Sequence, residues 1–519
     1  MQSCKTEQPT DLTKESLIPK PVSVTATGES FSLKGANILV GEALKDILGN
    51  YLAAELSTAT GLNPAVITTP ETEPSGTINL VVEEGDASLG TEGYELTITT
   101  EGITISANQP AGAFYGIQTL LQLIPLKADE SGDYKIATGT IRDYPTWSWR
   151  GSMLDVARHF FSVEDVKRYI DLISRYKMNI MHLHLTDDQG WRIEIKSWPN
   201  LALHGGATQV GGGKGGYYTQ EQYKELVAYA GARFITIIPE IDLPSHINAA
   251  LASYGELNSP DTKFPKEGNY VGPLETKGIG EGKDKPTDLY AGREVGWSTL
   301  SFSKPTTMKF VSDVIRELAE ITPGPYFHVG GDEAHVTKKE DYIEFINQFN
   351  GIVKANGMKM IGWEEIAQAN IDSNAIAQHW ASEDHAKEAA AKGAKIIMSP
   401  SKRVYLDMKY DSLSRIGYNW AAYIEVDDAY NWDPATRVPG INKDQILGVE
   451  APLWGETLQN MTDIEYLLFP RLPGIAEIGW TPAADRSWDE YKVRLGHHGP
   501  RMKALGIDFY PSAKVPWVE

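Results

Sequence analysis

Residues 326–334 read Tyr-Phe-His-Val-Gly-Gly-Asp-Glu-Ala, and this stretch decides how the chain is interpreted. Its aromatic and β-branched start follows Pro323-Gly324-Pro325 and predicts a short buried strand. The Gly330-Gly331 pair then lets the backbone turn and lets a ligand approach closely. Asp332 and Glu333 come next, and adjacent side chains of an extended segment point in opposite directions. The two carboxylates therefore cannot easily flank one bond as independent groups, although they can act on one ligand from different angles. A bare Gly-Asp-Glu is often an ordinary acidic loop, so the rest of the chain must decide.

Strand-like and helix-like segments alternate from about residue 144 to near the end of the chain. Apolar runs recur at residues 152–156, 178–185, 234–241, 326–329, 358–363, 375–380, 394–398 and 446–454. Helical spacing is found at residues 163–176, 220–230, 306–321, 339–356 and 464–478, and helix signals are weak after the fifth and seventh runs. Strands separated in this way by helices predict a (β/α)₈ barrel over residues 144–519.

Polar and aromatic side chains gather where the predicted strands end. The segments concerned are Asp155 to Phe160, His184 to Arg192, Pro239 to His246, Asp332-Glu333, Trp363 to Glu365, Gln378 to Trp380, Tyr405 to Asp407 and Trp454 to Glu456. In a barrel of this kind the chemistry is found at the carboxyl ends of the strands. Since packing alone would not place these residue types there so regularly, we predict an active site on that face.

The residues before the barrel predict a smaller α+β domain over residues 21–143. Strand patterns occur at residues 37–40, 77–82, 94–98 and 102–106, the last two as a hairpin, and helical patterns occur at residues 46–60 and 111–123. No chemical cluster is found in this domain. Residues 1–20 carry few apolar side chains and predict a flexible leader.

Length and charge limit the class of protein. A chain of 519 residues is expected to form two or three domains, and a formal net charge of −21 argues against a nucleic-acid partner or attraction to an anionic membrane. No apolar run is long enough to predict a transmembrane segment. The single cysteine, Cys4, excludes an intramolecular disulfide.

Cys4 follows Met1-Gln2-Ser3 and precedes a polar stretch, which is typical of the first mature residues of a bacterial lipoprotein. We therefore expect an exported protein, periplasmic or attached to the outer membrane through a lipid anchor at Cys4. A free thiol on a frayed terminus is the alternative. The oligomeric state stays open.

A glycine-rich segment and a histidine pair could each indicate a binding site or an ordinary structural feature. Residues 205–206 and 211–216 are rich in glycine, but Lys214 is followed by glycine rather than Ser or Thr, so a mobile rim loop is favoured over a phosphate cradle. His182 and His184 share one face of a predicted strand at a spacing that suits a metal ion. With no cysteine nearby and a hydrogen-bonding barrel interior available, we expect no metal and no cofactor.

Three motifs resemble glycoside hydrolase family 20, the β-N-acetylhexosaminidases. They are residues 182–192, the turn at residues 330–333 and Trp454-Gly455-Glu456-Thr457. The resemblance extends over the barrel and the domain before it. It implies an exo-acting, retaining hydrolase that removes terminal GlcNAc or GalNAc from glycans or chitooligosaccharides. The acetamido oxygen of the substrate would attack the anomeric carbon and form an oxazolinium ion. The adjacency of Asp332 and Glu333 fits this mechanism, which needs no carboxylate nucleophile.

The resemblance also implies roles for individual residues. Glu333 would be the general acid and then the general base, and Asp332 would hold the acetamido N–H and stabilise the positive charge. Tyr405 would donate its hydroxyl to the acetamido carbonyl. The other residues would bind or support the sugar: Trp363, Trp380 and Trp454 as walls around the acetamido group, Arg158, Asp407 and Glu456 at the hydroxyl groups, Asp187 and His246 behind Glu333, and Trp432 as a platform on the leaving side.

The sequence departs from the family pattern at Ser245, where glycine is common, and in residues 259–297, a long polar segment expected to form a rim loop away from the chemistry. A chitinase-like barrel is the nearest alternative, but its acids are spaced as Asp-x-Asp-x-Glu rather than contiguous. A non-catalytic sugar-binding barrel would lack the acid or its partner, and both are present. An adhesion module leaves the crowded barrel end unexplained.

Overall fold

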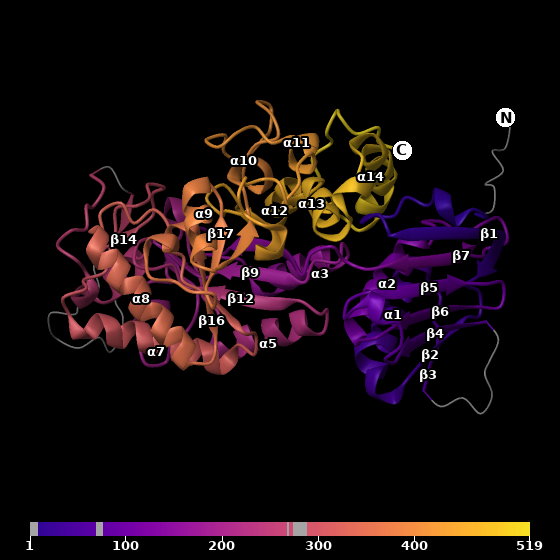
Figure 1. The fold of residues 1–519 in the computed structure, drawn as a ribbon, viewed down its shortest axis with the longest axis horizontal. Helices are drawn as coiled ribbons and strands as arrows, with labels where there is room; N and C mark the ends of the chain where they lie inside the picture. Colours follow the sequence, from indigo (N-terminus) through magenta and orange to yellow (C-terminus); the bar gives the residue numbers. More distant parts are fainter. Residues whose placement is uncertain (1–8, 69–75, 267–268, 273–287) are drawn as a thin grey trace.

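The computed structural model describes residues 9–68, 76–266, 269–272 and 288–519. Two units lie side by side, an N-terminal sheet with helices on one face and a closed barrel of eight parallel strands (Figure 1). The predicted fold, a (β/α)₈ barrel preceded by a small α+β domain, is confirmed.

The barrel strands run in the order β12-β15-β16-β17-β18-β19-β8-β9, and β9 pairs with β12 to close the ring. Their bounds are β8 (Trp149–Asp155), β9 (Ile180–His184), β12 (Thr236–Glu240), β15 (Tyr326–His328), β16 (Lys359–Trp363), β17 (Ile376–His379), β18 (Lys395–Met398) and β19 (Ile446–Leu453). Each strand coincides with one of the predicted apolar runs. These runs are continuous rather than alternating because both faces of a barrel strand are buried.

Alternate residues of the barrel strands point into the barrel and form stacked layers. The lowest layer is an apolar cluster of Trp149, Ile180, Ile238, Ile361, Ile376 and Ile397. Two residues further along, the inward positions are polar on several strands, among them His182, Glu240 and Gln378, all of them buried. An apolar floor therefore supports a layer of hydrogen-bonding side chains, and this layer lies under the site.

Helices connect the barrel strands and form the outer ring. They are α3 (Val163–Ser174), α5 (Gln220–Gly231), α7 (Pro305–Ile321), α8 (Lys339–Ala355), α9 (Glu383–Ala391), α12 (Met461–Leu468), α13 (Arg471–Trp480) and α14 (Trp488–Ala504), with short helices α4 (Asn200–Leu203) and α6 (Asn248–Ser253). None of the helices in the described ranges is long and apolar enough to cross a membrane.

The helix predictions are confirmed with one exception. A 3-10 helix, η7 (Glu364–Gln368), follows β16, and only the short α10 (Ser401–Val404) and α11 (Val426–Tyr430) follow β18, as the weak signals there indicated. The single helix predicted over residues 464–478 is wrong, because the chain forms α12 and α13 instead. Pro470 lies at the break, where it has no N–H to donate and disfavours a helical conformation of Phe469.

The N-terminal sheet has the order β1-β7-β5-β6-β4-β2-β3. Its elements are β1 (Ser23–Ser32), β2 (Asn37–Val40), β3 (Val66–Ile67), β4 (Thr77–Val82), β5 (Tyr94–Ile98), β6 (Gly102–Ala107), β7 (Lys135–Asp143), α1 (Asn50–Thr60) and α2 (Pro110–Leu123). The predicted hairpin is the antiparallel pair β5–β6. The sequence missed β3 and β7, and it missed β1, an edge strand whose largely exposed side chains give no apolar pattern.

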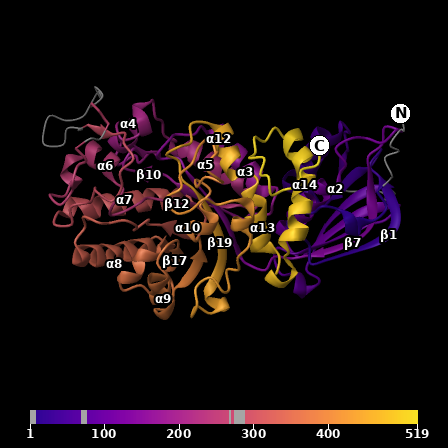
Figure 2. The same cartoon turned by 90° about the horizontal axis from the view of Figure 1, so that it is seen from above.

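Buried polar contacts join the two units. Trp480, at the end of α13, belongs to the core of the N-terminal domain and donates its indole N–H to Asp143 at 2.8 Å. The ammonium of Lys177 lies 2.8 Å from the same carboxylate, and both side chains are fully buried. Arg150 forms a second ion pair with Glu92 at 2.7 Å. Figure 2 shows α14 running between the barrel and the N-terminal sheet.

The flexible leader predicted over residues 1–20 is wrong for the part that the structure describes. Leu12 and Leu17 are buried in the core of the N-terminal domain and Ile18 in the core of the barrel. These few apolar side chains therefore anchor the described part of the leader to the two cores. They are too few and too widely spaced to form a helical or strand pattern in the sequence. Residues 1–8, with the predicted lipid-anchor residue Cys4, lie outside the described ranges.

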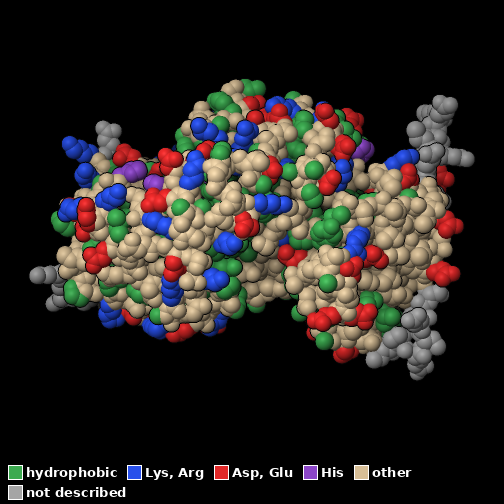
Figure 3. All heavy atoms as spheres, viewed as in Figure 1, with side chains coloured by type: hydrophobic (Ala, Val, Ile, Leu, Met, Phe, Trp, Pro, Cys, Tyr) green, Lys and Arg blue, Asp and Glu red, His purple; other side chains and the backbone are tan. Residues whose placement is uncertain are grey.

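Charged side chains of both signs are interspersed over the face drawn in Figure 3, with no basic patch gathered on it. A nucleic-acid partner requires such a patch. The view agrees with the net charge of −21.

Candidate active site

A pocket of about 450 Å³ opens among the carboxyl ends of the barrel strands. Its walls carry acids, cations and aromatic rings: Arg158, His246, Arg293, Val295, Asp332, Glu333, Trp380, Tyr405, Asp407, Tyr418, Trp420, Trp454 and Glu456. They belong to segments that follow β8, β12, β15, β17, β18 and β19. The pocket therefore lies on the face of the barrel where the sequence placed the active site.

The turn after β15 delivers the two adjacent carboxylates. Gly330 and Gly331 have φ of +70° and +92°, and Glu333 itself has φ of +45°, which is uncommon for a residue with a side chain. A Cβ on Gly330 would lie 1.9 Å from Oδ1 of Asp242, so only glycine fits. The hydroxyl of Tyr342 donates to the carbonyl of Gly331 at 2.7 Å and fixes the turn.

His246 lies between both carboxylates and a third. Its Nε2 is 3.4 Å from Oε2 of Glu333 and 3.6 Å from Oδ2 of Asp332, and its Nδ1 is 3.4 Å from Oδ1 of Asp187. Burial lowers the pKa of His246, but the carboxylates of Asp187, Asp242 and Asp332 raise it well above its ordinary value. The imidazole is therefore a cation that links the pocket to the layer beneath.

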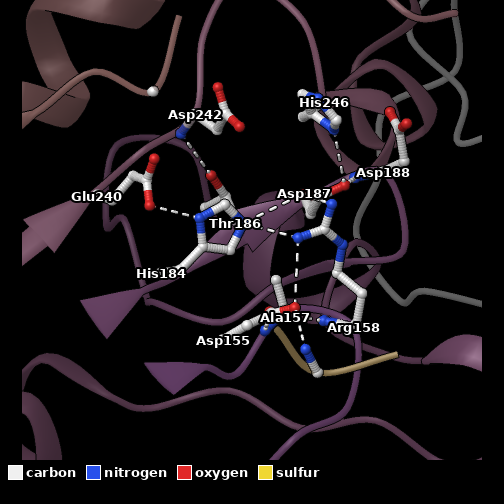
Figure 4. Close-up of polar contacts among 12 residues, drawn as sticks. Asp155, Ala157, Arg158, His184, Thr186, Asp187, Asp188, Glu240, Asp242 and His246 are labelled. Carbon is white, nitrogen blue, oxygen red and sulfur yellow. Dashed lines mark hydrogen bonds and ion pairs between the residues drawn. The ribbon is translucent and has the colours of Figure 1, made fainter. Parts of the chain in front are cut away.

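Asp187 connects His246 to a buried network (Figure 4). Its Oδ2 is 2.6 Å from Nη2 of Arg158 and 3.1 Å from Nε2 of His184, whose Nδ1 is in turn 2.5 Å from Glu240. Burial raises the pKa of Asp187, but Arg158 and His246 lower it far below its ordinary range. Asp187 is thus a permanent anion that holds His246 and Arg158 in place.

Arg158 is positioned from several sides. Its Nη1 lies 3.3 Å from Asp155, and its guanidinium carbon lies 4.9 Å from the ring centre of Trp454. Its side chain is 4% exposed. These contacts hold one face of the guanidinium against an aromatic ring while the group faces the pocket.

The neighbouring acids of the turn differ in proton affinity. Burial raises the pKa of Asp332 to about 6, opposed by His246 and assisted by the charge of Glu333. Burial also raises the pKa of Glu333, but the neighbouring imidazolium of His246 lowers it by more, so the net shift is downward. At mildly acidic pH the pair therefore holds one proton, mainly on Asp332.

Aromatic rings form the side of the pocket next to Asp332. Tyr405 and Trp380 lie nearly parallel, with ring centres 6.3 Å apart and an interplanar angle of 15°. Trp454 lies 6.3 Å from Tyr405. Burial raises the pKa of Tyr405 well above its ordinary value, with further contributions from Asp332 and Asp407, so the hydroxyl stays protonated and can donate.

Trp380 is held by the two acids that follow β16. Its backbone N–H donates to Glu364 at 2.7 Å, and its indole N–H lies 3.2 Å from both carboxylate oxygens of Glu365. Burial raises the pKa of Glu365 well above its ordinary value, and the charge of Asp332 raises it further. The indole is therefore oriented by a buried carboxyl group that tends to stay neutral.

Asp407 and Glu456 form the polar wall. Burial raises the pKa of Asp407 well above its ordinary value and Glu456 raises it further; burial also raises the pKa of Glu456, although Arg158 opposes the shift. Two buried acids that repel each other in this way are stabilised by any ligand that donates hydrogen bonds to them.

Several buried polar atoms in the pocket wall have no hydrogen-bond partner within the described part of the chain. They include Nε of Arg158, Oδ1 of Asp332, Oδ1 of Asp407, Oε2 of Glu456 and both ring nitrogens of His246, which makes ion pairs only. Unpaired buried polar atoms are costly and are rare in folded proteins. A ligand with several hydroxyl groups and an amide would satisfy them, and this is the most direct sign of the ligand's chemistry.

Most of the residues predicted for the site meet at this pocket. Asp332, Glu333, Tyr405, Arg158, His246, Trp380, Asp407, Trp454 and Glu456 line it. Asp187 lies behind His246, as expected. Trp363 is 1% exposed, donates its indole N–H to Glu240 at 3.1 Å and packs 5.7 Å from Trp454, so it backs the wall rather than lining it.

Trp432, predicted as a platform on the leaving side, does not line this pocket. Trp432 lines a separate depression with Lys402 and Tyr423. Trp420 lines the pocket instead; it is 56% exposed and packs edge-on against Trp380 and Tyr405. Both tryptophans lie in irregular segments after β18, where the sequence has no periodicity that could tell them apart.

Sequence reasoning also missed Tyr418, Arg293 and Val295. The last two belong to residues 259–297, the segment expected to lie away from the chemistry, and this expectation is wrong for its end, which lines the pocket. Part of that segment, residues 267–268 and 273–287, lies outside the described ranges. The pair Arg293 and Val295 carries no motif, and only the fold brings it to the mouth.

The histidine pair and the glycine-rich segment noted in the sequence both have structural explanations. His182 lies 2.8 Å from both Glu240 and Glu450. Burial lowers the pKa of His182, but the two acids raise it by more, to about 9. His184 is paired as described above, so both imidazoles serve the buried network. The glycine-rich segment is bound into the structure, since Val210 donates to the carbonyl of Arg158 at 2.9 Å and Gly211 to Ala291 at 2.9 Å.

The chain matches two domain families by sequence. "Glycosyl hydrolase family 20, catalytic domain" matches residues 147–483, and "Glycosyl hydrolase family 20, domain 2" matches residues 14–144. Among curated proteins, a β-N-acetylhexosaminidase of Cellulomonas fimi is 37% identical over 506 residues, covering 96% of this chain and 97% of the relative. A β-hexosaminidase of Porphyromonas gingivalis is 34% identical, covering 95% of this chain and 64% of the relative.

Solved structures agree with these matches. A family 20 β-N-acetylhexosaminidase from Streptomyces coelicolor A3(2) superposes with a TM-score of 0.90 at 44% identity, covering 98% of this chain and all of that one. A mutant β-hexosaminidase of Streptomyces plicatus, solved with its product GlcNAc, gives a TM-score of 0.90 at 45% identity, covering 99% of both chains.

Proposed function

The chain belongs to glycoside hydrolase family 20 and is an exo-acting β-N-acetylhexosaminidase, and we propose how the residues of its pocket divide the work of a retaining, substrate-assisted hydrolysis. The observation that carries the proposal is the arrangement around the turn after β15. Asp332 and Glu333 are adjacent, His246 lies between them, and Oδ1 of Asp332 is buried without a partner in the described chain. One carboxyl group can give a proton while the other receives an amide N–H.

In the first step the acetamido oxygen of the bound sugar attacks the anomeric carbon and the glycosidic bond breaks. Glu333 protonates the leaving oxygen, and the sugar becomes a cyclic oxazolinium ion. The nucleophile is part of the substrate, so the protein has only to hold it in position, which supplies a high effective molarity.

Asp332 and Tyr405 hold that nucleophile. Oδ1 of Asp332 accepts the acetamido N–H and stabilises the positive charge that develops on the nitrogen. The Tyr405 hydroxyl, kept protonated by burial, donates to the acetamido oxygen. Trp380 and Trp454 confine the methyl group, which excludes rotated conformers of the amide.

Substrate binding also moves the proton to the acid that needs it. Without substrate the proton belongs mainly to Asp332, whose pKa is about 6. A hydrogen bond donated by the acetamido N–H favours the ionised form of Asp332. The displaced proton then passes to Glu333, whose pKa rises as the sugar excludes water from it. The bound complex therefore holds an ionised Asp332 beside a protonated Glu333.

In the second step Glu333, now ionised, removes a proton from water as the water attacks the anomeric carbon. The oxazolinium ring opens, the acetamido group is restored, and the product keeps the β configuration after two inversions. His246, held as a cation by Asp187, stabilises the carboxylate of Glu333 between the two steps.

Arg158, Asp407 and Glu456 recognise the hydroxyl groups of the terminal sugar. Each presents a buried polar atom that lacks a partner in the described chain. Hydrogen bonds between hydroxyls and charged groups are stronger than neutral ones and fix the sugar in one pose. A terminal GlcNAc or GalNAc residue of a glycan or chitooligosaccharide supplies these hydroxyls.

The test is the release of nitrophenol from 4-nitrophenyl β-GlcNAc, with the β-glucoside as a matched control without an acetamido group. We expect hydrolysis of the first substrate only, with a β-configured first product by NMR. A thiazoline made from GlcNAc should inhibit competitively because it mimics the cyclic intermediate. Equal hydrolysis of the glucoside, or an inverted product, would exclude the mechanism.

We also propose that the protein is exported and carries a lipid on Cys4. The support is the Met1-Gln2-Ser3-Cys4 start followed by a polar segment. When the chain is expressed behind a lipoprotein signal that ends before Cys4, the protein should sediment with membranes, and Cys4→Ser should release it. Recovery of both forms in the soluble fraction would contradict the proposal.

A further inference from the structure

A second depression is lined by two of the chain segments that also line the active-site pocket. It has a volume of about 570 Å³ and contains Trp432 and Tyr423 together with cationic side chains from α10 and the segment after α11. The mechanism proposed above uses none of the residues that line this depression. The few residues of chain that separate its lining from that of the pocket point to a place for the rest of a substrate chain.

The aromatic residues of the depression offer flat apolar surfaces. The indole N–H of Trp432 donates to the carbonyl of Ala429 at 3.0 Å, so its one polar group is already used. One side of the ring packs against the barrel core, and the residue also lines the depression. Tyr423 is 47% exposed. Rings of this kind bind the C–H face of a pyranose, because that face is apolar while its edge carries hydroxyls.

The depression also carries charged side chains of both signs. They are Lys402, Arg403, Arg437, Asp428 and Asp433. Nη1 of Arg403 lies 3.8 Å from Oδ1 of Asp428, and Nη1 of Arg437 lies 3.0 Å from Oε1 of Glu383. Lys402, by contrast, forms no ion pair with the described residues. Three of the five charged lining residues are cationic and two are acidic; Arg403 and Arg437 lie beside acids, so Lys402 is the cation available to an anionic ligand. A cation of this kind attracts carboxylate or sulfate groups.

Two short segments form walls of both cavities. Tyr405 lines the active-site pocket and Arg403 the second depression; Trp420 lines the pocket and Tyr423 the depression. Three residues of extended chain span at most about 11 Å, so Trp420 and Tyr423 have Cα atoms no further apart than this. A short oligosaccharide that leaves the pocket over Trp420 can therefore reach Tyr423 and Trp432.

We propose that the depression beside α10 and α11 is a binding site for the distal part of the substrate, and that it prefers a glycan chain bearing carboxylate or sulfate groups. The inference rests on the proposed function, because the terminal GlcNAc must occupy the pocket. Trp432 and Tyr423 bind sugar rings there, and Lys402 binds an anionic substituent with support from Arg403 and Arg437.

The test compares three substrates. They are 4-nitrophenyl β-GlcNAc, the neutral pentamer of β-1,4-linked GlcNAc, and a hyaluronan pentasaccharide that begins with GlcNAc and carries carboxylates on alternate sugars. Tyr423→Ala, Trp432→Ala and Lys402→Gln should each lower kcat/KM for the hyaluronan chain by about 3- to 10-fold, in the range of one aromatic or charged contact. Hydrolysis of the nitrophenyl substrate should stay unchanged.

Matched controls separate local from general effects. Lys359→Gln removes a single exposed lysine at the amino end of β16, the opposite end of the barrel, and should change none of the rates. Because Trp432 also packs on the core, its removal costs stability; the exposed Tyr423 and Lys402 carry the test on their own. Added salt should weaken hydrolysis of the hyaluronan chain in the wild type more than in Lys402→Gln.

Each outcome decides the proposal. Unchanged kcat/KM for the hyaluronan chain in Tyr423→Ala and Lys402→Gln would overturn it, and so would equal losses with the nitrophenyl substrate. Equal losses in Lys402→Gln with both pentasaccharides would overturn the preference for anionic chains. A wild type that fails to hydrolyse the nitrophenyl substrate would refute the proposed function instead. The depression is then tested separately, by calorimetric titration of a hyaluronan tetrasaccharide that begins with glucuronate.

Discussion

At the residue scale, the chemistry depends on one backbone turn that sets two different acids side by side. Glu333 has the lowered pKa and lies next to the cationic His246, whereas Asp332 has a pKa of about 6. Environments that drive two carboxyl groups apart in pKa allow one to act as acid and the other as anion. Without substrate the pKa of Asp332 is above that of Glu333. This order of the two pKa values must reverse when Asp332 accepts the acetamido N–H.

The pair predicts the pH dependence of kcat/KM. The reactive free enzyme needs one proton on Asp332 and Glu333 together, and this proton is lost as the pH rises through about 6, the pKa of Asp332. We therefore expect kcat/KM to be highest in mildly acidic solution and to fall about tenfold per pH unit above that value. In Asp332→Asn the remaining acid has the lowered pKa, so the decline should begin at lower pH. A decline at the same pH in both proteins would contradict the assignment.

The two acids should also respond differently to the leaving group. Glu333→Gln should lower kcat/KM by about 10²–10⁴-fold for leaving groups of high pKa and much less for activated aryl groups, and azide should restore part of the second step, because it needs no general base. Asp332→Asn should lose about 10²–10³-fold whatever the leaving group, and azide should not help, because ring closure is needed in every case. The same leaving-group dependence and azide response in both variants would refute the separate roles.

How far the sequence predicts the site differs from residue to residue. Asp332, Glu333 and Arg158 directly follow strands, so the strand pattern places them at the barrel mouth. Trp420 and Arg293 lie in long segments without periodicity, and their position depends on how those segments fold over the mouth. Trp432 also lies in such a segment, and the sequence could not show that it lines a separate depression.

At the scale of elements, the carboxyl ends of the barrel strands position the side chains of the site. After β15 the positive φ of Gly330 and Gly331 sets the path of the turn that carries the two acids. The barrel strands were predictable because parallel strands buried on both faces read as continuous apolar runs. The exposed edge strand β1, the break between α12 and α13 and the buried segment after residue 9 were missed. Each depends on long-range contacts or on a single proline rather than on a repeating pattern.

The turn after β15 gives a prediction at this scale. Gly330→Ala should destabilise the protein by about 2–4 kcal/mol, because it adds a left-handed penalty and a Cβ 1.9 Å from Asp242. It should also lower kcat/KM by about 10²-fold, since it displaces Asp332 and Glu333. Gly357→Ala is the matched control, with φ of +77° and no atom within 4 Å of its Cβ. Gly357→Ala should lower stability but not activity. An equal loss of activity in both variants would show that the turn after β15 does not position the two acids.

At the scale of the whole molecule, the N-terminal domain and the barrel share one buried interface. Trp480 of the barrel contributes to the other domain's core, and the ion pair of Lys177 with Asp143 lies between the units with both side chains fully buried. A buried pair adds little net stability, but breaking it leaves an uncompensated charge.

Asp143→Ala should therefore lower the free energy of unfolding by about 3–5 kcal/mol, measured by denaturant unfolding, while KM for the nitrophenyl substrate stays unchanged at low temperature. The double variant Asp143→Ala with Lys177→Met should recover part of the loss, since no charge is then left unpaired. A double variant as unstable as the sum of two independent losses would show that the charges do not interact.

Attack by the substrate's own acetamido oxygen is the central claim, and it is tested most directly by weakening that oxygen as a nucleophile. The measurement is kcat/KM for 4-nitrophenyl glycosides of GlcNAc whose acetyl group carries none, one, two or three fluorine atoms. Fluorine withdraws electrons from the carbonyl oxygen and leaves the leaving group unchanged. We predict a loss that grows with each fluorine and reaches about 10²-fold or more for the trifluoro substrate, because intramolecular attack supplies much of the rate. The same kcat/KM across the series would show that another group attacks the anomeric carbon.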